Sequence, residues 1–332
     1  MIKFSNLKKT LIIAEIGNNH EGSIDIALEL IERAAEAGVD AVKFQTYIPE
    51  KFISNKDFER LSRLNKFKLK SDDYSKISKK AEKLGLIFFS TPLDLDSADF
   101  LNNLQDLFKI SSGDNNFYPL IRKVSQFNKP TLISTGLVNS ENIDFILKYW
   151  IEVGGDPANL CFMHCVSSYP VPENQVNISV IHTLIKEYPK VLIGYSDHTV
   201  GIKVPVLAVA AGAKIIEKHF TLDKQFSSFR DHQLSADPKE MEEMVNQIRD
   251  VEIIMGVSTK KIQPCELESK VQMRRSIAAS RDLVSGTVLC IDDLTWVRPG
   301  VGFAPGLEET LIGQTLNLSL ARGELILKKH LK

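Results

Sequence analysis

The chain has 332 residues, of which 43% are hydrophobic and 25% are charged, a composition typical of a soluble globular protein with one large and one small domain. Its 41 Lys and Arg residues nearly balance 42 Asp and Glu residues, so bulk charge predicts neither a nucleic-acid nor a membrane partner. The sequence has no signal-peptide core and no apolar window of about 18 residues, so we expect a cytoplasmic protein. Its four cysteines form no CxxC pair, and we expect their thiols to be reduced.

Short β-rich apolar runs alternate with amphipathic helical patterns as far as residue 255. The eight runs span residues 11–17, 41–47, 86–92, 107–113, 131–136, 160–166, 191–197 and 214–220. Strands that are buried on both faces have such continuous apolar runs, and eight βα repeats over about 250 residues indicate a barrel. An open doubly wound sheet is the alternative, but no GxGxxG motif follows the first run. The sequence therefore predicts an α/β protein with a (β/α)8 TIM barrel over residues 1–256.

The pattern changes after the predicted barrel. Residues 257–274 are polar and irregular and are predicted to be a linker, whereas residues 275–332 contain short β runs separated by Ser-Gly, Asp-Asp and Pro-Gly turns. We therefore expect a small β-rich domain at the C-terminal end. A domain of this size is close to the lower limit for independent folding, so docking to the barrel or to another subunit would stabilise it.

Polar side chains collect at the carboxyl ends of the predicted strands, where barrel enzymes place their active sites. In chain order they include Glu15, Lys43, Gln45, Thr91, Lys109, Ser112, Asp114, Ser167, Tyr169, Ser196, His198, Glu217 and His219. Alternation along the last strand places residues 215, 217 and 219 on one face. If that face points inward, Lys218 points outward, and we expect its stem to be packed and its amine to be free.

His198 and His219 end the seventh and eighth runs, which are neighbours in a barrel. Two imidazoles at adjoining strand ends can supply part of a site for Mn²⁺ or another divalent ion, Mg²⁺ and Co²⁺ included. The alternative is that each histidine is an ordinary loop or core residue with satisfied hydrogen bonds.

Lys43 and Lys109 each interrupt an apolar strand, and a lysine that points into a barrel needs an anion. With the hydroxyls of Thr91, Ser112 and Ser196 they could hold a phosphate and a carboxylate; alternatively, each lies on a helix-covered face beside a partner carboxylate. Among the acidic groups, Glu15 and Asp114 are candidates for a general base. Either one could instead pair with a lysine.

Taken together, these segments resemble the sialic acid synthase family. The similarity rests on the ordered motifs AEIGNNHEG, VKFQTY, STP, KISSGDNN, ISTG, HCVSSYP, GYSDHT and EKHFTLD, and the C-terminal segment resembles the antifreeze-like (SAF) domain that ends these enzymes. The resemblance implies a transferase that condenses phosphoenolpyruvate with an N-acylated hexosamine, by C–O cleavage, to a nine-carbon 2-keto-3-deoxy acid such as N-acetylneuraminate or its 9-phosphate. A different metal-dependent barrel aldolase or hydrolase and a non-catalytic sugar-binding protein are the more distant alternatives.

The resemblance also implies roles for single residues. His198 and His219 match the metal ligands, and Arg298 matches an arginine that enters the partner's active site in a domain-swapped homodimer. The residues that match phosphoenolpyruvate contacts are Lys43, Thr91, Lys109, Ser112 and Ser196. The residues that match contacts to the sugar and the attacking water are Glu15, Gln45, Asp114, Ser167, Tyr169 and Asp231. Asp114 and Ser167 replace the Glu and Asn of members that use N-acetylmannosamine, which favours its 6-phosphate. Diacetamido hexoses, the precursors of legionaminic and pseudaminic acids, are the alternative acceptors, and the role of Arg230 stays open.

Overall fold

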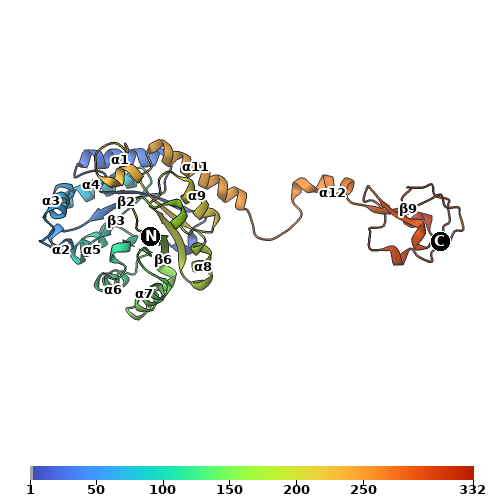
Figure 1. Ribbon diagram of the computed structural model, residues 1–332, viewed down its shortest axis with the longest axis horizontal. Helices are drawn as coiled ribbons and strands as arrows, with labels where there is room; N and C mark the ends of the chain where they lie inside the picture. Colours follow the sequence, from blue (N-terminus) through green and yellow to red (C-terminus); the bar gives the residue numbers. More distant parts are fainter. Residues whose placement is uncertain (1–2) are drawn as a thin grey trace. The chain divides into compact units, whose positions relative to one another are not determined.

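The computed structural model describes residues 3–332, which form two compact units divided between Gly256 and Val257. The first unit is a ring of parallel strands surrounded by helices (Figure 1). Its strands are β1 (Leu11–Gly17), β2 (Ala41–Thr46), β3 (Ile87–Pro92), β4 (Phe108–Ile110), β5 (Thr131–Ser134), β6 (Leu160–Cys165), β7 (Leu192–Asp197) and β8 (Ile215–His219). The predicted TIM barrel is confirmed.

The helices follow the strands in alternation. They are α1 (Ile24–Glu36), α2 (Pro49–Phe52), α3 (Phe58–Phe67), α4 (Ser71–Lys83), α5 (Leu95–Asn102), α6 (Tyr118–Gln126), α7 (Ser140–Glu152), α8 (Val180–Glu187), α9 (Lys203–Ala210), α10 (Arg230–Leu234) and α11 (Pro238–Met255). In α1, the Ser23 side chain caps the first turn by accepting from the Ile26 amide, and Ala27, Leu30 and Ile31 are buried. The local signals and the tertiary packing therefore agree.

The barrel closes through the first and last strands. The ladder between β1 and β8 runs from the pair Leu11 and Ile215 to the pair Glu15 and His219, and the sheet order is β3-β2-β1-β8-β7-β6-β5-β4. Among the described residues no ladder joins β3 to β4. Instead the buried Gln105 side chain accepts from the Ser90 amide at 2.7 Å and donates to the Ser90 carbonyl at 3.1 Å. One side-chain amide thus satisfies the buried N–H and C=O groups of Ser90 in β3.

Alternation along the strands creates two apolar layers. Inward-facing Ile13, Phe89, Leu132, Met163 and Ile215 fill the lower part of the barrel, while their neighbours in sequence pack against the helices. Gly194 of β7 belongs to the inner layer because a Cβ atom there would lie 2.4 Å from Met163 Sδ and 2.8 Å from the Ile215 carbonyl. The lower barrel is therefore a packed core, and space for a ligand remains only above it.

The fourth strand is shorter than predicted. The apolar run at 107–113 predicted a strand throughout, but β4 covers only Phe108–Ile110 and a 3-10 turn follows at Ser112–Asp114. The Asp114 amide donates to the Ser111 carbonyl and the Ser111 hydroxyl to the Asp114 carboxylate. These local side-chain bonds compete with the ladder and end the strand early.

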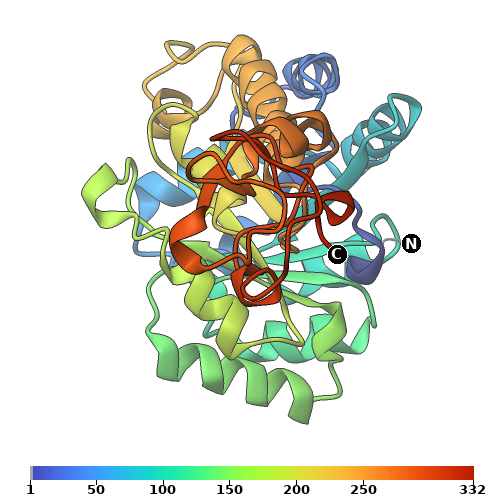
Figure 2. The same ribbon diagram turned by 90° about the vertical axis from the view of Figure 1, so that its right-hand side faces the viewer.

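The second unit contains α12 (Leu267–Met273) and a two-stranded antiparallel sheet of β9 (Ser276–Ala279) and β10 (Leu294–Val297). Most of this unit consists of loops and short turns (Figure 2). Its own core is built from aliphatic side chains that include Ile277, Leu289 and Leu311. Across both units, no helix in the described range 3–332 is long and apolar enough to cross a membrane.

Candidate active site

A cavity of about 1790 Å³ lies at the carboxyl ends of the barrel strands. Thirteen of the predicted site residues line it: Glu15, Lys43, Gln45, Thr91, Lys109, Ser112, Asp114, Ser167, Tyr169, Ser196, His198, His219 and Asp231. The remaining one, Arg298, belongs to the second unit. Residues from all eight strand ends or the loops that follow them therefore share one cavity.

The floor of this cavity is a layer of four buried charges, which we call the charged layer: Glu15, Lys43, Lys109 and Glu217. Lys43 Nζ lies 2.7 Å from Glu15 Oε2 and 3.7 Å from Glu217 Oε1, and Lys109 Nζ lies 2.6 Å from Glu217 Oε2. Both lysines therefore face the barrel interior and not a helix-covered surface, and their partner carboxylates compensate the cost of burial.

The two carboxyls of the charged layer differ in acidity. Burial raises the pKa of Glu15, against the effect of Lys43, and the neighbouring Glu217 raises it further. For Glu217 burial acts in the same direction, but Lys109 and Lys43 outweigh it and lower its pKa to about 2. Burial disfavours the charged form of Lys43, yet Glu15 and Glu217 raise its pKa. Glu217 is thus the permanent counter-ion, and Glu15 is the carboxyl that accepts a proton more readily.

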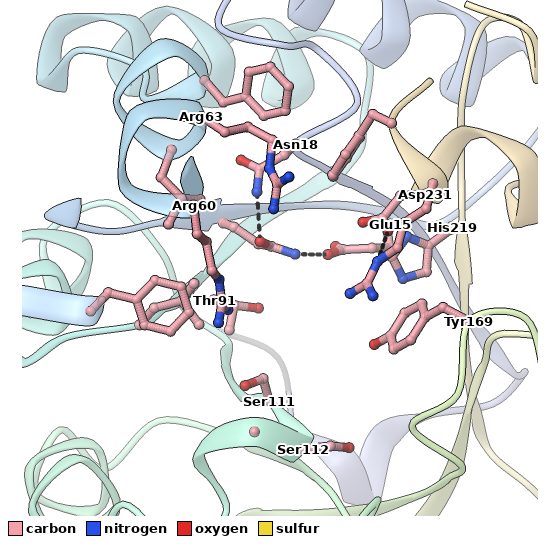
Figure 3. A pocket seen from close by; sticks show the side chains of 18 of the residues that line it. Glu15, Asn18, Arg60, Arg63, Thr91, Ser111, Ser112, Tyr169, His219 and Asp231 are labelled. Atoms are coloured by element: carbon pink, nitrogen blue, oxygen red, sulfur yellow. Dashed lines mark hydrogen bonds and ion pairs between the residues drawn. The ribbon is translucent and has the colours of Figure 1, made fainter. Parts of the chain in front are cut away.

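Polar side chains extend from the charged layer towards the rim. Gln45 Nε2 donates to Glu15 Oε1 at 3.1 Å, and Asn18 Nδ2 donates to Gln45 Oε1 at 3.0 Å (Figure 3). On the other side, Lys43 donates to Thr91 Oγ1 at 3.0 Å and the Ser196 hydroxyl donates to Glu217 Oε1 at 3.1 Å. These bonds orient each charged group before any ligand arrives.

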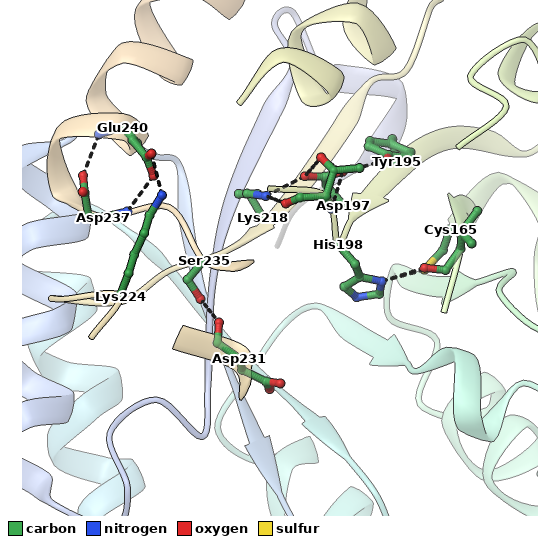
Figure 4. Close-up of polar contacts among 12 residues, drawn as sticks. Cys165, Tyr195, Asp197, His198, Lys218, Lys224, Asp231, Ser235, Asp237 and Glu240 are labelled. Atoms are coloured by element: carbon green, nitrogen blue, oxygen red, sulfur yellow. Dashed lines mark hydrogen bonds and ion pairs between the residues drawn. The ribbon is translucent and has the colours of Figure 1, made fainter. Parts of the chain in front are cut away.

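His198 and His219 lie next to each other at the carboxyl-terminal ends of β7 and β8, with ring centroids 5.3 Å apart. The Nδ1–H of His198 donates to the Val166 carbonyl at 2.9 Å (Figure 4), which leaves the Nε2 lone pair free, as in a metal-ligating histidine. His219 Nδ1 is buried and has no hydrogen-bond partner among the described residues. Burial, together with the neighbouring His198, lowers the pKa of His219 well below its usual value. A neutral imidazole with an unpartnered nitrogen fits a divalent metal.

Within the described range, no group of three or more His, Cys, Asp or Glu side chains converges on a common metal position. The protein could therefore supply two imidazole ligands, and water or substrate oxygens would have to supply the others.

Asp114 and two serines form the wall next to β4. Asp114 Oδ2 accepts from Ser111 at 2.6 Å, and burial raises the pKa of Asp114 against the effects of Ser111 and Arg60. The Gly136 amide donates to Ser112 Oγ at 3.1 Å. A Cβ atom at Gly136 would lie 2.3 Å from Ser167 Oγ and 2.6 Å from Ser112 Oγ, so glycine here leaves space for both hydroxyls.

The opposite wall contains Tyr169, Arg230 and Asp231. The Tyr169 ring lies against His198 with centroids 4.1 Å apart, and the Arg230 guanidinium lies 4.7 Å from the centroid of the Tyr169 ring. Arg230 Nε is 3.5 Å from Asp231 Oδ1. Burial raises the pKa of Asp231, and Arg230 and His198 oppose this effect. The cation of Arg230 therefore offsets the acidic group at this side of the cavity.

The prediction for Lys218 is wrong in one respect. Its side chain points away from the cavity as expected, but its amine is fully buried and lies 2.7 Å from Asp197 Oδ2, with a second bond to the Thr199 carbonyl (Figure 4). Register explains the difference, because β7 places Asp197 directly beside Lys218. Tyr195 also donates to this carboxylate at 2.7 Å.

Sequence reasoning missed several cavity residues. They include Asn18, Arg60, Arg63, Ser111 and Phe229. Arg60 and Arg63 belong to α3, an additional helix between β2 and α4, and their side chains point into the cavity from the side opposite Tyr169 and His219 (Figure 3). Their i and i+3 spacing was the available signal, but charged residues at such spacing are usual on any solvent-facing helix.

Comparison with known proteins identifies the family. Residues 30–260 match the NeuB family and residues 274–332 match the SAF domain. The chain is 46% identical over 294 residues to an uncharacterised protein of Methanocaldococcus jannaschii, covering 88% of this chain and 86% of that protein. It is 37% identical over 334 residues to N,N'-diacetyllegionaminic acid synthase of Campylobacter jejuni, covering 96% and 99%. Other relatives are named N-acetylneuraminate-9-phosphate synthase (34% identity, Homo sapiens) and pseudaminic acid synthase (33%, Campylobacter jejuni).

The fold comparison agrees. A crystal structure of the sialic acid synthetase from Leptospira borgpetersenii in complex with citrate aligns with a TM-score of 0.75 and 32% identity, over 81% of this chain and 94% of that one. The chain therefore belongs to the NeuB family and is an enzyme whose barrel is followed by a SAF domain. The family resemblance seen in the sequence motifs is confirmed.

Proposed function

We propose that the protein is a nonulosonic acid synthase that condenses phosphoenolpyruvate with an N-acyl hexosamine, N-acetylmannosamine or its 6-phosphate. In this reaction C3 of phosphoenolpyruvate forms a bond to the aldehyde carbon of the open-chain sugar, and the aldehyde oxygen takes up a proton. Water adds at C2 and loses a proton, and the C–O bond to phosphate breaks. The products are a nine-carbon 2-keto-3-deoxy acid, N-acetylneuraminate or its 9-phosphate, and inorganic phosphate.

The observation that carries this proposal is that the charged layer and the imidazole pair line the same cavity. Phosphoenolpyruvate presents a phosphate and a carboxylate, and Lys43 and Lys109 are the buried cations that face the cavity. With Glu15 ionised the layer is neutral. Because the pKa of Glu15 is raised, its protonation costs less than usual, and the layer with a neutral Glu15 carries a net positive charge that suits an anionic substrate.

A divalent metal is part of the proposal, with Mn²⁺ as the first choice and Mg²⁺ or Co²⁺ as alternatives. His198 and His219 would hold it through imidazole nitrogens. When bound, such an ion acts as a Lewis acid towards a carbonyl oxygen. The chain's own contribution is to fix the His198 ring, through the Val166 carbonyl and through the contact between Tyr169 and His198.

We assign the proton of the attacking water to Asp114. Gln45 and Lys43 engage both oxygens of Glu15, whereas Ser111 engages only Oδ2 of Asp114. Asp114 therefore keeps one oxygen for a water molecule. Its raised pKa brings it closer to neutral pH, where a general base is more effective.

A second candidate function differs only in the acceptor sugar. Relatives named N,N'-diacetyllegionaminic acid synthase reach 37% and 38% identity over almost the whole chain, slightly above those named N-acetylneuraminate-9-phosphate synthase. This ranking favours a diacetamido hexose as the alternative acceptor. A different metal-dependent barrel aldolase would not consume phosphoenolpyruvate at all.

We also propose a homodimer in which Arg298 of one subunit enters the cavity of the other subunit and binds substrate there. The proposal follows from the family resemblance, in which Arg298 of the second unit matches the arginine that enters the partner's active site. An arginine could there hold an anionic or hydroxyl group of the substrates with several donors at once.

An acceptor panel tests the proposed reaction. The purified protein is incubated with Mn²⁺, phosphoenolpyruvate and one of three sugars: N-acetylmannosamine, its 6-phosphate or a 2,4-diacetamido hexose. Phosphate release and formation of the 2-keto acid are measured together. Equal amounts of both products with one sugar support the proposal. Loss of phosphoenolpyruvate without a sugar-dependent keto acid would contradict it.

A further inference from the structure

The α3 side of the cavity carries positive charge without local compensation. Arg60, Arg63 and Lys66 line the cavity from this helix, and the acidic residue on the same segment of the lining is Glu59. In the described part of the chain, none of these three cations forms an ion pair with a carboxylate within 4 Å. Lys51, from the preceding helix, is already paired with Asp96. The excess charge therefore belongs to the cavity.

The side chains of Arg60 and Arg63 point into the cavity, and an aromatic contact holds Arg60. Arg60 lies over the Phe52 ring at 5.2 Å from the centroid, a contact that restricts the side chain without using its N–H donors. Beneath the pair, the buried Leu64 and Phe67 anchor α3 to the barrel. Figure 3 shows the two guanidinium groups on one side of the cavity and Tyr169 and His219 on the other.

This arrangement matters because the reacting end of the acceptor is fixed at the imidazole pair in the proposed function. A hexose in its open-chain form then extends away from His198 and His219 with its terminal carbon leading. The side of the cavity opposite those rings is where Arg60 and Arg63 present free donors. Planar guanidinium groups bind phosphate oxygens in pairs of hydrogen bonds.

We propose that Arg60 and Arg63 form an anion subsite that selects an acceptor sugar with a phosphate monoester on its terminal carbon. This inference rests on the proposed function and narrows its acceptor. It also separates two anions by location: the charged layer receives phosphoenolpyruvate, and the α3 arginines receive the phosphate of the sugar.

Binding measured without turnover tests the subsite directly. N-acetylmannosamine 6-phosphate and N-acetylmannosamine are each titrated into the full-length protein with Mn²⁺, by calorimetry. We expect the wild type to bind the phosphorylated sugar at least about tenfold more tightly than the neutral one, and the Arg60→Met, Arg63→Met double variant to lose that difference, because charge-assisted hydrogen bonds are lost. Equal loss of affinity for the neutral sugar would overturn the proposal.

Two further variants provide controls. Lys68→Met removes one positive charge at the end of the same helix, from a residue that is exposed and does not line the cavity, and it should preserve the difference between the two sugars. The double replacement by lysine keeps the charge but not the paired donors, and should restore part of the affinity. If Lys68→Met weakens binding as much as the double arginine variant, the effect is general electrostatic attraction and no subsite exists.

Kinetics separates failure of this subsite from failure of the proposed function. With an active enzyme, the double arginine variant should raise KM for the sugar phosphate about tenfold or more and leave KM for phosphoenolpyruvate within about twofold. A rise confined to KM for phosphoenolpyruvate would overturn the subsite and leave the reaction intact. If no sugar supports phosphate release, the proposed function fails, and the calorimetric comparison still decides whether the arginines bind a sugar phosphate.

Discussion

Lys109 Nζ lies 2.6 Å from Glu217 Oε2 at the centre of the barrel, and both side chains are almost completely buried. The same carboxylate accepts from Ser196 and lies 3.7 Å from Lys43. Glu217 therefore compensates two cations that would otherwise be buried alone. The same carboxylate therefore stabilises the fold and sets the charge of the cavity.

The first prediction concerns this counter-ion. Glu217→Gln should lower the free energy of unfolding at pH 7 by about 3 kcal/mol, because it leaves two buried ammonium groups with less compensation. Urea unfolding followed by circular dichroism measures the change. Asp96→Asn, which breaks the exposed pair with Lys51, is the control and should cost less than about 1 kcal/mol. Similar effects for the two variants would contradict our description of the charged layer.

The pH dependence of this stabilisation has a defined sign. The pKa of Glu217 falls from 4.5 to about 2 on folding, so its stabilising contribution is complete above pH 4.5 and is lost as the pH falls towards 2. The difference in unfolding free energy between wild type and Glu217→Gln should therefore be constant from pH 7 to 5 and should shrink below pH 4.5. A difference that grew on acidification would show the opposite assignment of charge.

The second prediction concerns the imidazole pair. His219→Ala should weaken Mn²⁺ binding by at least about tenfold, since one of two protein ligands is lost. Titration calorimetry in the absence of substrates provides a readout that does not depend on turnover. His182→Ala, on the exposed face of α8, removes an imidazole that does not line the cavity and should bind Mn²⁺ as the wild type does. Unchanged affinity in His219→Ala would exclude this residue as a ligand.

The third prediction tests the base. Asp114→Asn should lower kcat about a hundredfold or more, and the wild-type rate should fall as the pH drops through the raised pKa of Asp114. Ser111 donates to Asp114 and lowers its pKa, so Ser111→Ala should move this acid limb to higher pH while the enzyme stays active. If Asp114→Asn keeps its rate and Glu15→Gln loses it, Glu15 is the base.

The fourth prediction tests the proposed exchange of Arg298 between subunits. Arg298→Ala and His219→Ala should each be inactive or strongly impaired, and a mixture refolded together should regain activity in heterodimers that contain one intact cavity with an intact partner arginine. Arg322→Ala, an exposed arginine of the same unit, should be active by itself. If heterodimers form but activity is not restored, Arg298 either acts in the cavity of its own subunit or has no role in the reaction.

The fifth prediction compares two glycines. Gly136→Ala would place a Cβ atom 2.3 Å from Ser167 Oγ and 2.6 Å from Ser112 Oγ, so we expect lower kcat/KM because both hydroxyls must move. Gly194→Ala would meet Met163 Sδ at 2.4 Å and the Ile215 carbonyl at 2.8 Å in the packed core, and should cost about 1–3 kcal/mol of stability. Thermal unfolding and steady-state kinetics, measured on both, should separate the two effects.

Periodicity in the sequence was sufficient for the barrel and for the polar strand ends that line the cavity, such as Lys43 and His219. Strands buried on both faces produce continuous apolar runs. The charged residues that interrupt these runs, such as Lys43 and Glu217, are therefore expected at the carboxyl-terminal end of the barrel, where the active site lies. What escaped prediction depends on partners distant in sequence. Lys218 is neutralised by Asp197 from the neighbouring strand, a pairing that requires the register of β7 and β8.

Arg60 and Arg63 escaped for a different reason. A short amphipathic helix with several cations reads as an ordinary solvated surface, and only the position of α3 at the rim distinguishes a cavity wall from a free face. Local pattern identifies which residues a helix exposes. It does not identify what they are exposed to.

Among the described residues no ladder joins β3 to β4, and the Gln105 side chain binds the Ser90 backbone there instead. This break in the ring has a consequence for how the chain folds. Every other neighbouring pair of strands in the barrel is joined by a backbone ladder, so the barrel is one curled sheet with β3 and β4 as its edge strands. The first strand of the chain, β1, is a central strand of this sheet. Its ladder with β8 joins residues from opposite ends of the first unit. In a circular permutant of the first unit alone, Met1–Gly256, that begins at β4 and ends at β3, β8 and β1 would be consecutive strands. The loop that closes when the β1–β8 ladder forms would be shorter, and the entropic cost of closing it would be lower.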